Sequence, residues 1–556
     1  MNLKFAVFIA AFSAIISGCS DNGGGPTSSS KSGAGDIKTQ SPIEKAYSDK
    51  DGEQLDVDQL LSLFPGYMQV RYADARFDDK SGATVVSNLE FHAPGDYDGN
   101  NGFVAERAEL YGVDLDAVER VKAATEAGAD APMEPIFEKV RLFGLRALDE
   151  ETPSTVKIGA VELDHLRVRR GGIPENDNGA SGVAGLFNAF DLAGVYFQDI
   201  DVTSAEDADA SVKFFAPDLR FVGIGGGKLS ALLAKDLDYT IEQSPAAIAE
   251  AGRVLGPAGD IFVNGPLRGF IAPEHQRTTI ETFAWRNIDF SGLLAYGLRG
   301  EEPPITAHDL INLGEIRADN MEAFLGDRRL SVVPESVVSP MEFTWLAPSK
   351  FRAYTKGGEY DFTAYLPAEE TDALAALKKH GLDKVKGDSE FDYDWNADKG
   401  GASLSSKFDT TGFADFNFDV ALDGLNLKTI HAAQQAGDNQ AVMKLARLKS
   451  LAITLDDETM LDAFYELSAI QAGGSPEDVR AATPSLLRFT ALELGRNSPK
   501  LKSYIEALAD FLQDGGRLEI RAAPETPVPL SEIQAVAGQG PDAAANLIAL
   551  TVTRSE

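Results

Sequence analysis

The sequence predicts an α+β fold that consists mainly of antiparallel β-sheet, with curved or bulged strands, helical excursions and a helix-rich C-terminal part. Three observations support this prediction. Apolar and polar residues alternate through most of residues 136–347, which is typical of strands with one buried face. A more regular alternation between residues 389 and 422 predicts a three-stranded meander. From Thr429 the apolar residues recur at helical spacing instead.

Length and composition predict more than one domain. The chain has 556 residues, and a domain usually takes about 100–200. Its 44% hydrophobic and 25% charged residues are typical of a globular protein. We expect a signal peptide at 1–18, a flexible tether at 19–42, a β-rich domain with helical insertions at 43–340, and the meander with C-terminal helices at 341–556.

The first part of the body is expected to mix helices and strands. Asp56 to Phe64 has the pattern of a short helix. Tyr67 to Phe77 and Ala83 to His92 flank a turn-rich loop, so they predict a hairpin. Val104 to Glu126 has the spacing of an amphipathic helix.

An eight-residue pattern recurs in the β-rich region. Each copy reads apolar-x-apolar, two mostly polar residues, then apolar-x-apolar. The copies are Val161–Val168, Val195–Val202, Phe283–Phe290 and Ile316–Ala323. A period of two would place the two halves of a copy on opposite faces, unless a bulge or bend absorbs one residue. We therefore expect bulged or bent strands in a strongly curved sheet; the alternative is that such octets arise by chance in β-rich sequence.

The C-terminal part shows the clearest helical spacing. Four helices are expected, at Thr429–Leu445, Glu458–Ala472, Pro476–Leu487 and Ser498–Gln513. Pro476 suits the first turn of its helix, and Ser475 is placed to cap it.

Charge limits the classes of partner. The formal net charge is −35, and such a surface opposes nonspecific binding to nucleic acid and to anionic lipid headgroups. Beyond the N-terminal segment there is no run of 18 apolar residues, so no transmembrane helix is expected.

The N-terminus carries the most specific signal in the chain. Lys4 precedes an apolar run from Phe5 to Ile16, which is too short to span a bilayer but fits a signal peptide. The run ends in Ile16-Ser17-Gly18-Cys19, which contains the only cysteine. This quartet resembles the lipobox of bacterial lipoproteins. An ordinary secretory signal and an uncut anchor are the alternatives.

The resemblance implies that Cys19 is acylated after cleavage before it, so that the protein joins a membrane through covalent lipid. It also implies an envelope location, and Ser20 after the cysteine favours the periplasmic face of the outer membrane. Two or more acyl chains tether a protein durably, whereas one holds it only marginally.

Metal and catalytic motifs are incomplete. Asp96, Asp98 and Asn100 place oxygen donors in one loop, as calcium requires, but the rest of an EF-hand is missing. A solvated Asx-turn loop is the alternative. No two of the six histidines lie at a zinc-binding spacing. The glycine-rich segment Gly223–Leu229 lacks the first glycine and the hydroxyl of a phosphate loop, so we expect a β-turn there.

The body also resembles large, repetitive β-rich envelope proteins of Gram-negative bacteria, many of them uncharacterised. The bent octets, the acidic meander and Phe511-Leu512-x-x-Gly515-Gly516-x-Leu518 carry this resemblance. Some proteins in that group are thought to hold or move lipids along a curved β-groove. We expect a non-enzymatic binding or scaffold lipoprotein for a lipid, polysaccharide or protein; alternatives are a hydrolase of envelope material with a dispersed site and a structural spacer.

Overall fold

The computed structural model describes most of the chain after residue 36. The described residues are 37–63, 69–92, 102–123, 131–148, 154–171, 180–207, 210–244, 246, 274–438, 441–496, 498–538 and 540–556. Within them the chain forms two compact units, one ending at Gly326 and one running from Asp327 to Glu556. They are called the N-terminal unit and the C-terminal unit, and each is described by itself.

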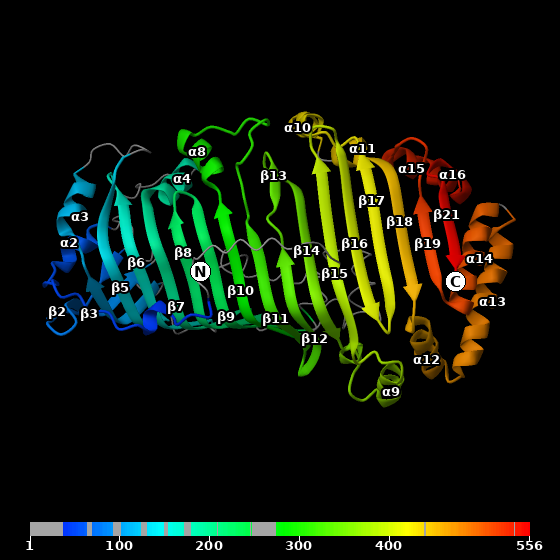
Figure 1. Ribbon diagram of the computed structural model, residues 1–556, viewed down its shortest axis with the longest axis horizontal. Helices are drawn as coiled ribbons and strands as arrows, with labels where there is room; N and C mark the ends of the chain where they lie inside the picture. Colours follow the sequence, from blue (N-terminus) through cyan, green and yellow to red (C-terminus); the bar gives the residue numbers. More distant parts are fainter. Residues whose placement is uncertain are drawn as a thin grey trace. The chain divides into compact units, whose positions relative to one another are not determined.

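The N-terminal unit is built on an antiparallel sheet (Figure 1). From β3 to β11 each strand pairs with the next one in the chain, and β1 and β2 both pair with β3. The strands are β1 Gln69–Arg71, β2 Asp74–Asp78, β3 Ala83–His92, β4 Gly102–Tyr111, β5 Met133–Ala147, β6 Thr155–Arg169, β7 Phe190–Asp207, β8 Ala210–Gly225, β9 Lys228–Gln243, β10 His275–Asp289 and β11 Glu315–Leu325. The predicted hairpin of β2 and β3 and the mainly antiparallel fold are confirmed.

Short helices connect or cover these strands. They are η1 Pro42–Glu44, α2 Val57–Leu61, α3 Leu115–Lys122, α4 Ala180–Ala189 and α8 Ser291–Arg299. The Asp56 side chain accepts a hydrogen bond from the Gln59 amide and caps α2, as the helix predicted there requires. The carboxylate of Asp114 accepts from the Ala117 amide at 2.8 Å and caps α3.

The predicted helix at Val104–Glu126 is wrong. Its first part is strand β4, and of its described residues only Leu115–Lys122 are helical. Alanine, glutamate and arginine favour a helix locally, but β4 pairs with β3 on one side and β5 on the other. Ala105 and Ala108 are fully buried in that arrangement. Long-range pairing therefore overrides local propensity here.

The sheet of the N-terminal unit has two distinct faces. We call the face on which α2 and α3 pack the inner face; Val57 and Val118 join its core with Ile136 of β5. The opposite, outer face is crossed by residues 37–49, here called the strap. Ile37 packs on Ala231 and Leu233, which are at outer-face positions of β9.

The strap includes residues that were expected to belong to the flexible tether. Ile37 is only 5% exposed, and the guanidinium of Arg220 donates to the Thr39 carbonyl at 2.7 Å. Further along, Arg141 donates to the Lys45 carbonyl at 2.8 Å. The Ile37 side chain and buried Arg220 thus hold the first residues of the strap in the folded unit, and buried Arg141 holds the strap at Lys45.

A row of bends crosses the sheet at matching positions of the strands. In every second strand from β3 to β11 one residue has a left-handed φ; these residues are Asn88, Gly144, Asp199, Asp236 and Asn320. The residues opposite them on the intervening strands are Glu106, Gly159, Pro217 and Glu281. A second row contains His165, Gly223 and Asn287 of β6, β8 and β10, also with positive φ.

These bends explain the recurring octets. The fifth residue of the four copies is His165, Asp199, Asn287 and Asn320, and each has φ between 49° and 62°. On β6 the two halves of the octet face the same core: Val161 and Val168 are buried in it, and Leu163 and Leu166 pack against it. Pairing continues across the bend without an inserted residue, since Ile158 pairs with Ile200 and Ala160 with Gln198. At this bend β6 and β7 are therefore bent without a bulge, whereas the β5–β6 register shifts between Pro135 and Phe137, opposite the second half of the β6 octet.

The C-terminal unit combines antiparallel strands with helices at their ends and edges (Figure 1). Its strands are β12 Arg328–Val338, β13 Glu342–Thr344, β14 Ala347–Tyr360, β15 Val385–Asn396, β16 Gly401–Thr411, β17 Ala414–Asp423, β18 Arg447–Asp457, β19 Arg517–Ala522, β20 Val528–Pro529 and β21 Leu550–Ser555. Its helices are η2 Phe362–Tyr365, α9 Thr371–Lys379, α10 Leu427–Gln435, α11 Ala441–Leu445, α12 Met460–Ala472, α13 Pro476–Leu494, α14 Pro499–Asp514, α15 Leu530–Ala537 and α16 Pro541–Leu547.

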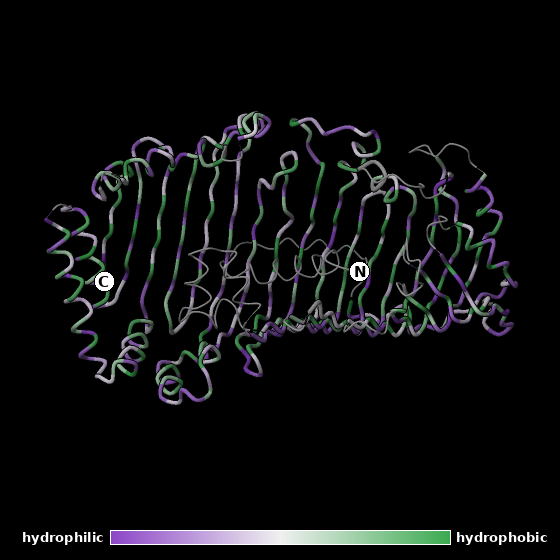
Figure 2. The backbone as a smooth tube through the Cα atoms, turned by 180° about the vertical axis from the view of Figure 1, so that it is seen from behind, coloured by the Kyte–Doolittle hydropathy of each residue, from purple (hydrophilic) through white to green (hydrophobic). Residues whose placement is uncertain are grey.

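The predicted meander is confirmed as β15, β16 and β17. Hydrophobic and hydrophilic segments alternate along these strands and those of the N-terminal unit (Figure 2). β14 runs through Gly357-Gly358 with a register shift. Two helix predictions nearby are wrong. The helix expected at 429–445 is two helices, and α13 continues to Leu494.

Among the described residues, no helix is both long enough and apolar enough to cross a bilayer.

Candidate functional site

The inner face of β7–β11 is a continuous apolar surface. Because the strands pair without a register shift across the bends, apolar side chains of neighbouring strands lie opposite one another. One row of paired residues is Val195, Phe221, Leu232, Trp285 and Ile316. The next row is Phe197, Leu219, Ala234, Phe283 and Ala318. The rings of Phe197 and Phe221 meet edge to face, with centroids 6.0 Å apart.

Burial changes along this face. Under α2 and α3 the inner residues of the first strands are closed off, and Ile136 and Ala105 have no exposed area. At β7 and β8 the large side chains of Phe197, Leu219 and Phe221 are only partly buried, whereas Leu232 and Ala234 of β9 and Phe283 of β10 are buried. In the described part of the chain, α2 and α3 pack only at the β3–β7 end of the core. The apolar face therefore extends beyond the helices that cover it.

The outer face carries a buried charge cluster under the strap. Glu162 has no exposed area, and its carboxylate accepts from the Arg141 guanidinium at 2.7 Å and from the Lys139 ammonium. The same ammonium lies 3.2 Å from Asp164. The Tyr47 ring covers Lys139, with the nitrogen 5.2 Å from the ring centroid.

The strap tyrosine depends on this environment. Burial, together with a hydrogen bond to Glu138, raises the pKa of Tyr47 to about 12. The phenol therefore stays protonated at physiological pH and donates to Glu138 at 2.8 Å. With its charges matched and its polar atoms bonded, the cluster fixes the strap to the sheet.

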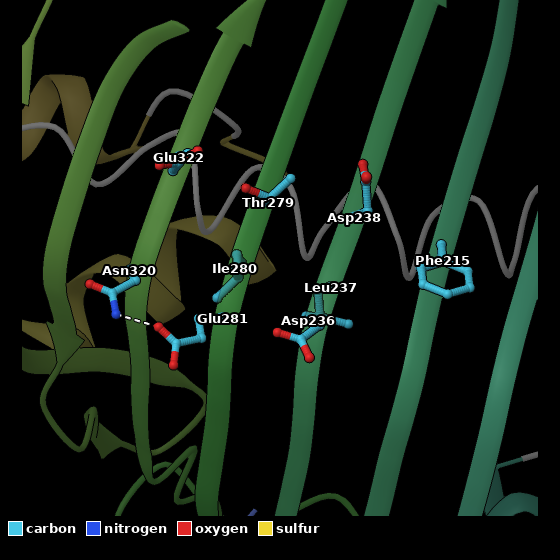
Figure 3. Close-up of a pocket in the computed structure, with 9 residues that line it drawn as sticks. All are labelled: Phe215, Asp236, Leu237, Asp238, Thr279, Ile280, Glu281, Asn320 and Glu322. Atoms are coloured by element: carbon cyan, nitrogen blue, oxygen red, sulfur yellow. Dashed lines mark hydrogen bonds between the residues drawn. The ribbon is translucent and has the colours of Figure 1, made fainter. Parts of the chain in front are cut away.

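An acidic trough lies on the outer face beside the first row of bends (Figure 3). Its volume is about 370 Å³, and it is lined by Phe215, Asp236, Leu237, Asp238, Thr279, Ile280, Glu281, Asn320 and Glu322. The carboxylates of Asp236, Asp238, Glu281 and Glu322 come from three different strands.

The trough is poorly suited to catalysis. Arg277 donates to Asp238 at 3.0 Å, and the Asn320 amide donates to Glu281. Phe215 is 44% exposed beside them. The carboxylates are thus partly engaged on an open surface, which does not provide the water-excluded setting of a reaction centre.

The structure describes only some of the candidate site residues named from the sequence. Cys19 and the loop with Asp96, Asp98 and Asn100 lie outside the described residues. Gly226 and Gly227, with φ of 55° and 79°, form the two-residue turn between β8 and β9, as predicted for that segment.

Five of the six histidines in the described part contact different neighbours. His92, His165 and His380 contact Glu90, Asp164 and Glu466. His275 lies 3.6 Å from Glu242, and His431 packs on Trp345. Within the described residues, no three metal-ligating side chains come together in a possible metal site.

The sequence pointed to the inner face only indirectly. The octets predicted bent strands, but they gave no indication that five neighbouring strands align them into one surface. The charge cluster and the strap were missed, because the fold alone brings Ile37 to Leu233, Lys45 to Arg141 and Tyr47 to Lys139.

Comparison with known proteins finds a family match for only part of the chain. A family model described as "Uncharacterized protein" matches residues 407–555. This segment lies within the C-terminal unit, from β16 to β21. No curated protein matches the chain.

Proposed function

We propose that this chain is a membrane-anchored envelope lipoprotein whose N-terminal unit binds a lipid-class ligand on the inner face of β7–β11. The observation that carries the proposal is the continuous apolar face, whose large side chains at β7 and β8 are only partly buried. Apolar surface gains about 25 cal/mol for each Å² removed from water, so this face favours an apolar partner.

The bends support a lipid ligand over a polysaccharide. In β6 and β7 the bends turn the apolar side chains of both halves of a strand toward the same face. Val195, Phe197, Ile200 and Val202 of β7 are an example. A sugar-binding surface instead requires polar groups among its aromatic side chains. The outer face has such groups in the acidic trough, but there Asp238 already accepts from Arg277 and Glu281 from Asn320.

The anchor supports the envelope location. Lipobox-like Ile16-Ser17-Gly18-Cys19 is the only feature that assigns a location. Covalent lipid at Cys19 would keep the apolar face near a source of lipid molecules, with the membrane as partner. Ser20 favours the periplasmic face of the outer membrane.

Native mass spectrometry tests the lipid ligand. The full chain is purified from membranes in a mild detergent, alongside a Cys19→Ala variant that has no acylation site. We expect both proteins to retain noncovalent lipid, seen as adducts that collisional activation removes. Bare protein masses for both, together with an organic extract free of lipid beyond detergent controls, would contradict the proposal.

A further inference from the structure

The C-terminal half of α13 exposes an apolar stripe. Leu486, Phe489 and Leu492 are 66%, 60% and 58% exposed, and Leu494 is 47% exposed. The first three are spaced three residues apart, so they lie along one side of the helix. The opposite side is packed, since Pro484 and Ala491 are buried. Exposed apolar patches of this kind mark interaction sites.

The helix that carries the stripe is held in place. Ser475 caps it by accepting a hydrogen bond from the Asp478 amide at 3.1 Å. Arg488 donates to Asp510 and to Gln513 of α14, both at 2.7 Å. Tyr465 of α12 is 1% exposed and donates to the Leu512 carbonyl of α14. The stripe is therefore presented by a fixed surface.

Basic side chains accompany the stripe in an otherwise acidic chain. Residues 486–502 contain four cations, Arg488, Arg496, Lys500 and Lys502, and one anion, Glu493. The chain as a whole has a net charge of −35. Arg488 and Lys502 pair with Asp510 and Glu506. Arg496 and Lys500 form no ion pair among the residues that the structure describes, so they remain for an external anion.

We propose that the end of α13 and the start of α14 dock on an anionic lipid surface, with Leu486, Phe489 and Leu492 inserted among the lipids. Apolar side chains beside cations are what a helix needs to lie in a membrane interface. Four side chains expose far less than the roughly 800 Å² per partner of a stable protein interface. The proposal does not depend on the lipid ligand of the N-terminal unit.

Site-specific fluorescence tests insertion directly. Because Cys19 is the only cysteine, a Cys19→Ser chain accepts one probe at Phe489→Cys or, as control, at Met443→Cys. Met443 is 61% exposed on α11. With vesicles of phosphatidylglycerol and phosphatidylethanolamine we expect a blue shift and a several-fold gain in emission of an NBD probe at 489 only. With phosphatidylcholine the gain is smaller.

An unchanged spectrum at 489, or equal changes at 489 and 443, would overturn the proposal. A blue shift at 489 that rises with protein concentration and needs no vesicles would instead identify a second copy as the occupant.

Removal of the stripe provides a second test. Leu486→Ser with Leu492→Ser should weaken co-sedimentation with the anionic vesicles at least about tenfold. The matched control, Val442→Ser with Met443→Ser, also removes two exposed apolar side chains and should leave it unchanged. Unchanged circular dichroism shows that both variants fold. Equal binding of the two variants would overturn the proposal.

Discussion

Charged side chains in the N-terminal unit are buried only where partners surround them. Glu162 is held by Lys139 and Arg141. Glu134, at 7% exposure, accepts from Arg120 at 2.8 Å and from Arg170 at 2.7 Å. Removing one member of such a group leaves the other charges without compensation. These contacts link β5 to α3 and to the residue after β6.

Glu134→Gln tests this at the residue scale. Hydrogen bonds from Arg120 and Arg170 lower the pKa of Glu134, so its ionised form stabilises the fold at neutral pH. The contribution is present above the unfolded pKa and is lost as pH falls through the lower folded pKa. We expect a loss of about 1–3 kcal/mol in unfolding free energy at pH 7 by urea titration, and a smaller loss at pH 3.

The control is Glu369→Gln, at an exposed position of the C-terminal unit, which should change stability little at either pH. An equal loss for Glu134→Gln at pH 7 and pH 3 would show that shape, and not charge, sets its effect.

At the scale of single elements, the bends are the feature that distinguishes these strands. Asp199 has φ of 53°, while Asp201 on the same strand pairs with Lys157 in ordinary register. Asparagine and aspartate tolerate the left-handed region better than other residues with a Cβ, and glycine tolerates it without steric cost.

Exchange of these two aspartates for glycine and valine should give opposite results. We expect Asp199→Gly to be neutral or stabilising by up to about 1 kcal/mol, and Asp199→Val to cost about 1–2 kcal/mol. At Asp201, glycine should destabilise and valine should be tolerated. Urea unfolding of the four variants measures this. If the glycine and valine variants had the same order of stability at both positions, the left-handed conformation of Asp199 would be contradicted.

The recurring octets made some of the bends predictable from the sequence. In each octet the apolar-polar alternation shifts by one residue, and this shift located the bends at His165, Asp199, Asn287 and Asn320. Asn88 was missed, because its strand shows a less regular pattern. The error at β4 has a different source: Ala105 and Ala108 have strong helix propensity, and only partners distant in sequence make them strand residues. The inner face itself depends on how strands align, which local sequence does not encode.

At the scale of the whole molecule, the proposed anchor has its own test. Cys19→Ala should abolish incorporation of an alkyne palmitate analogue in cells, because it removes the only thiol. Label and membrane fraction are followed together by click chemistry and blotting. The matched control is Ser17→Ala, which keeps a small residue in the lipobox-like quartet and should remain labelled. Persistent label on Cys19→Ala would contradict acylation at this residue.

Photo-crosslinking at two positions of one strand tests whether the inner face of the N-terminal unit holds a lipid. Phe221 of β8 lies on the inner face against Phe197, whereas Phe215 of the same strand lines the acidic trough. Each is replaced in turn by p-benzoylphenylalanine, and membranes from cells that express the full chain are irradiated. We expect a lipid-mass adduct at position 221 and none at 215. Absence of an adduct at 221, or equal adducts at both, would contradict the proposed lipid site.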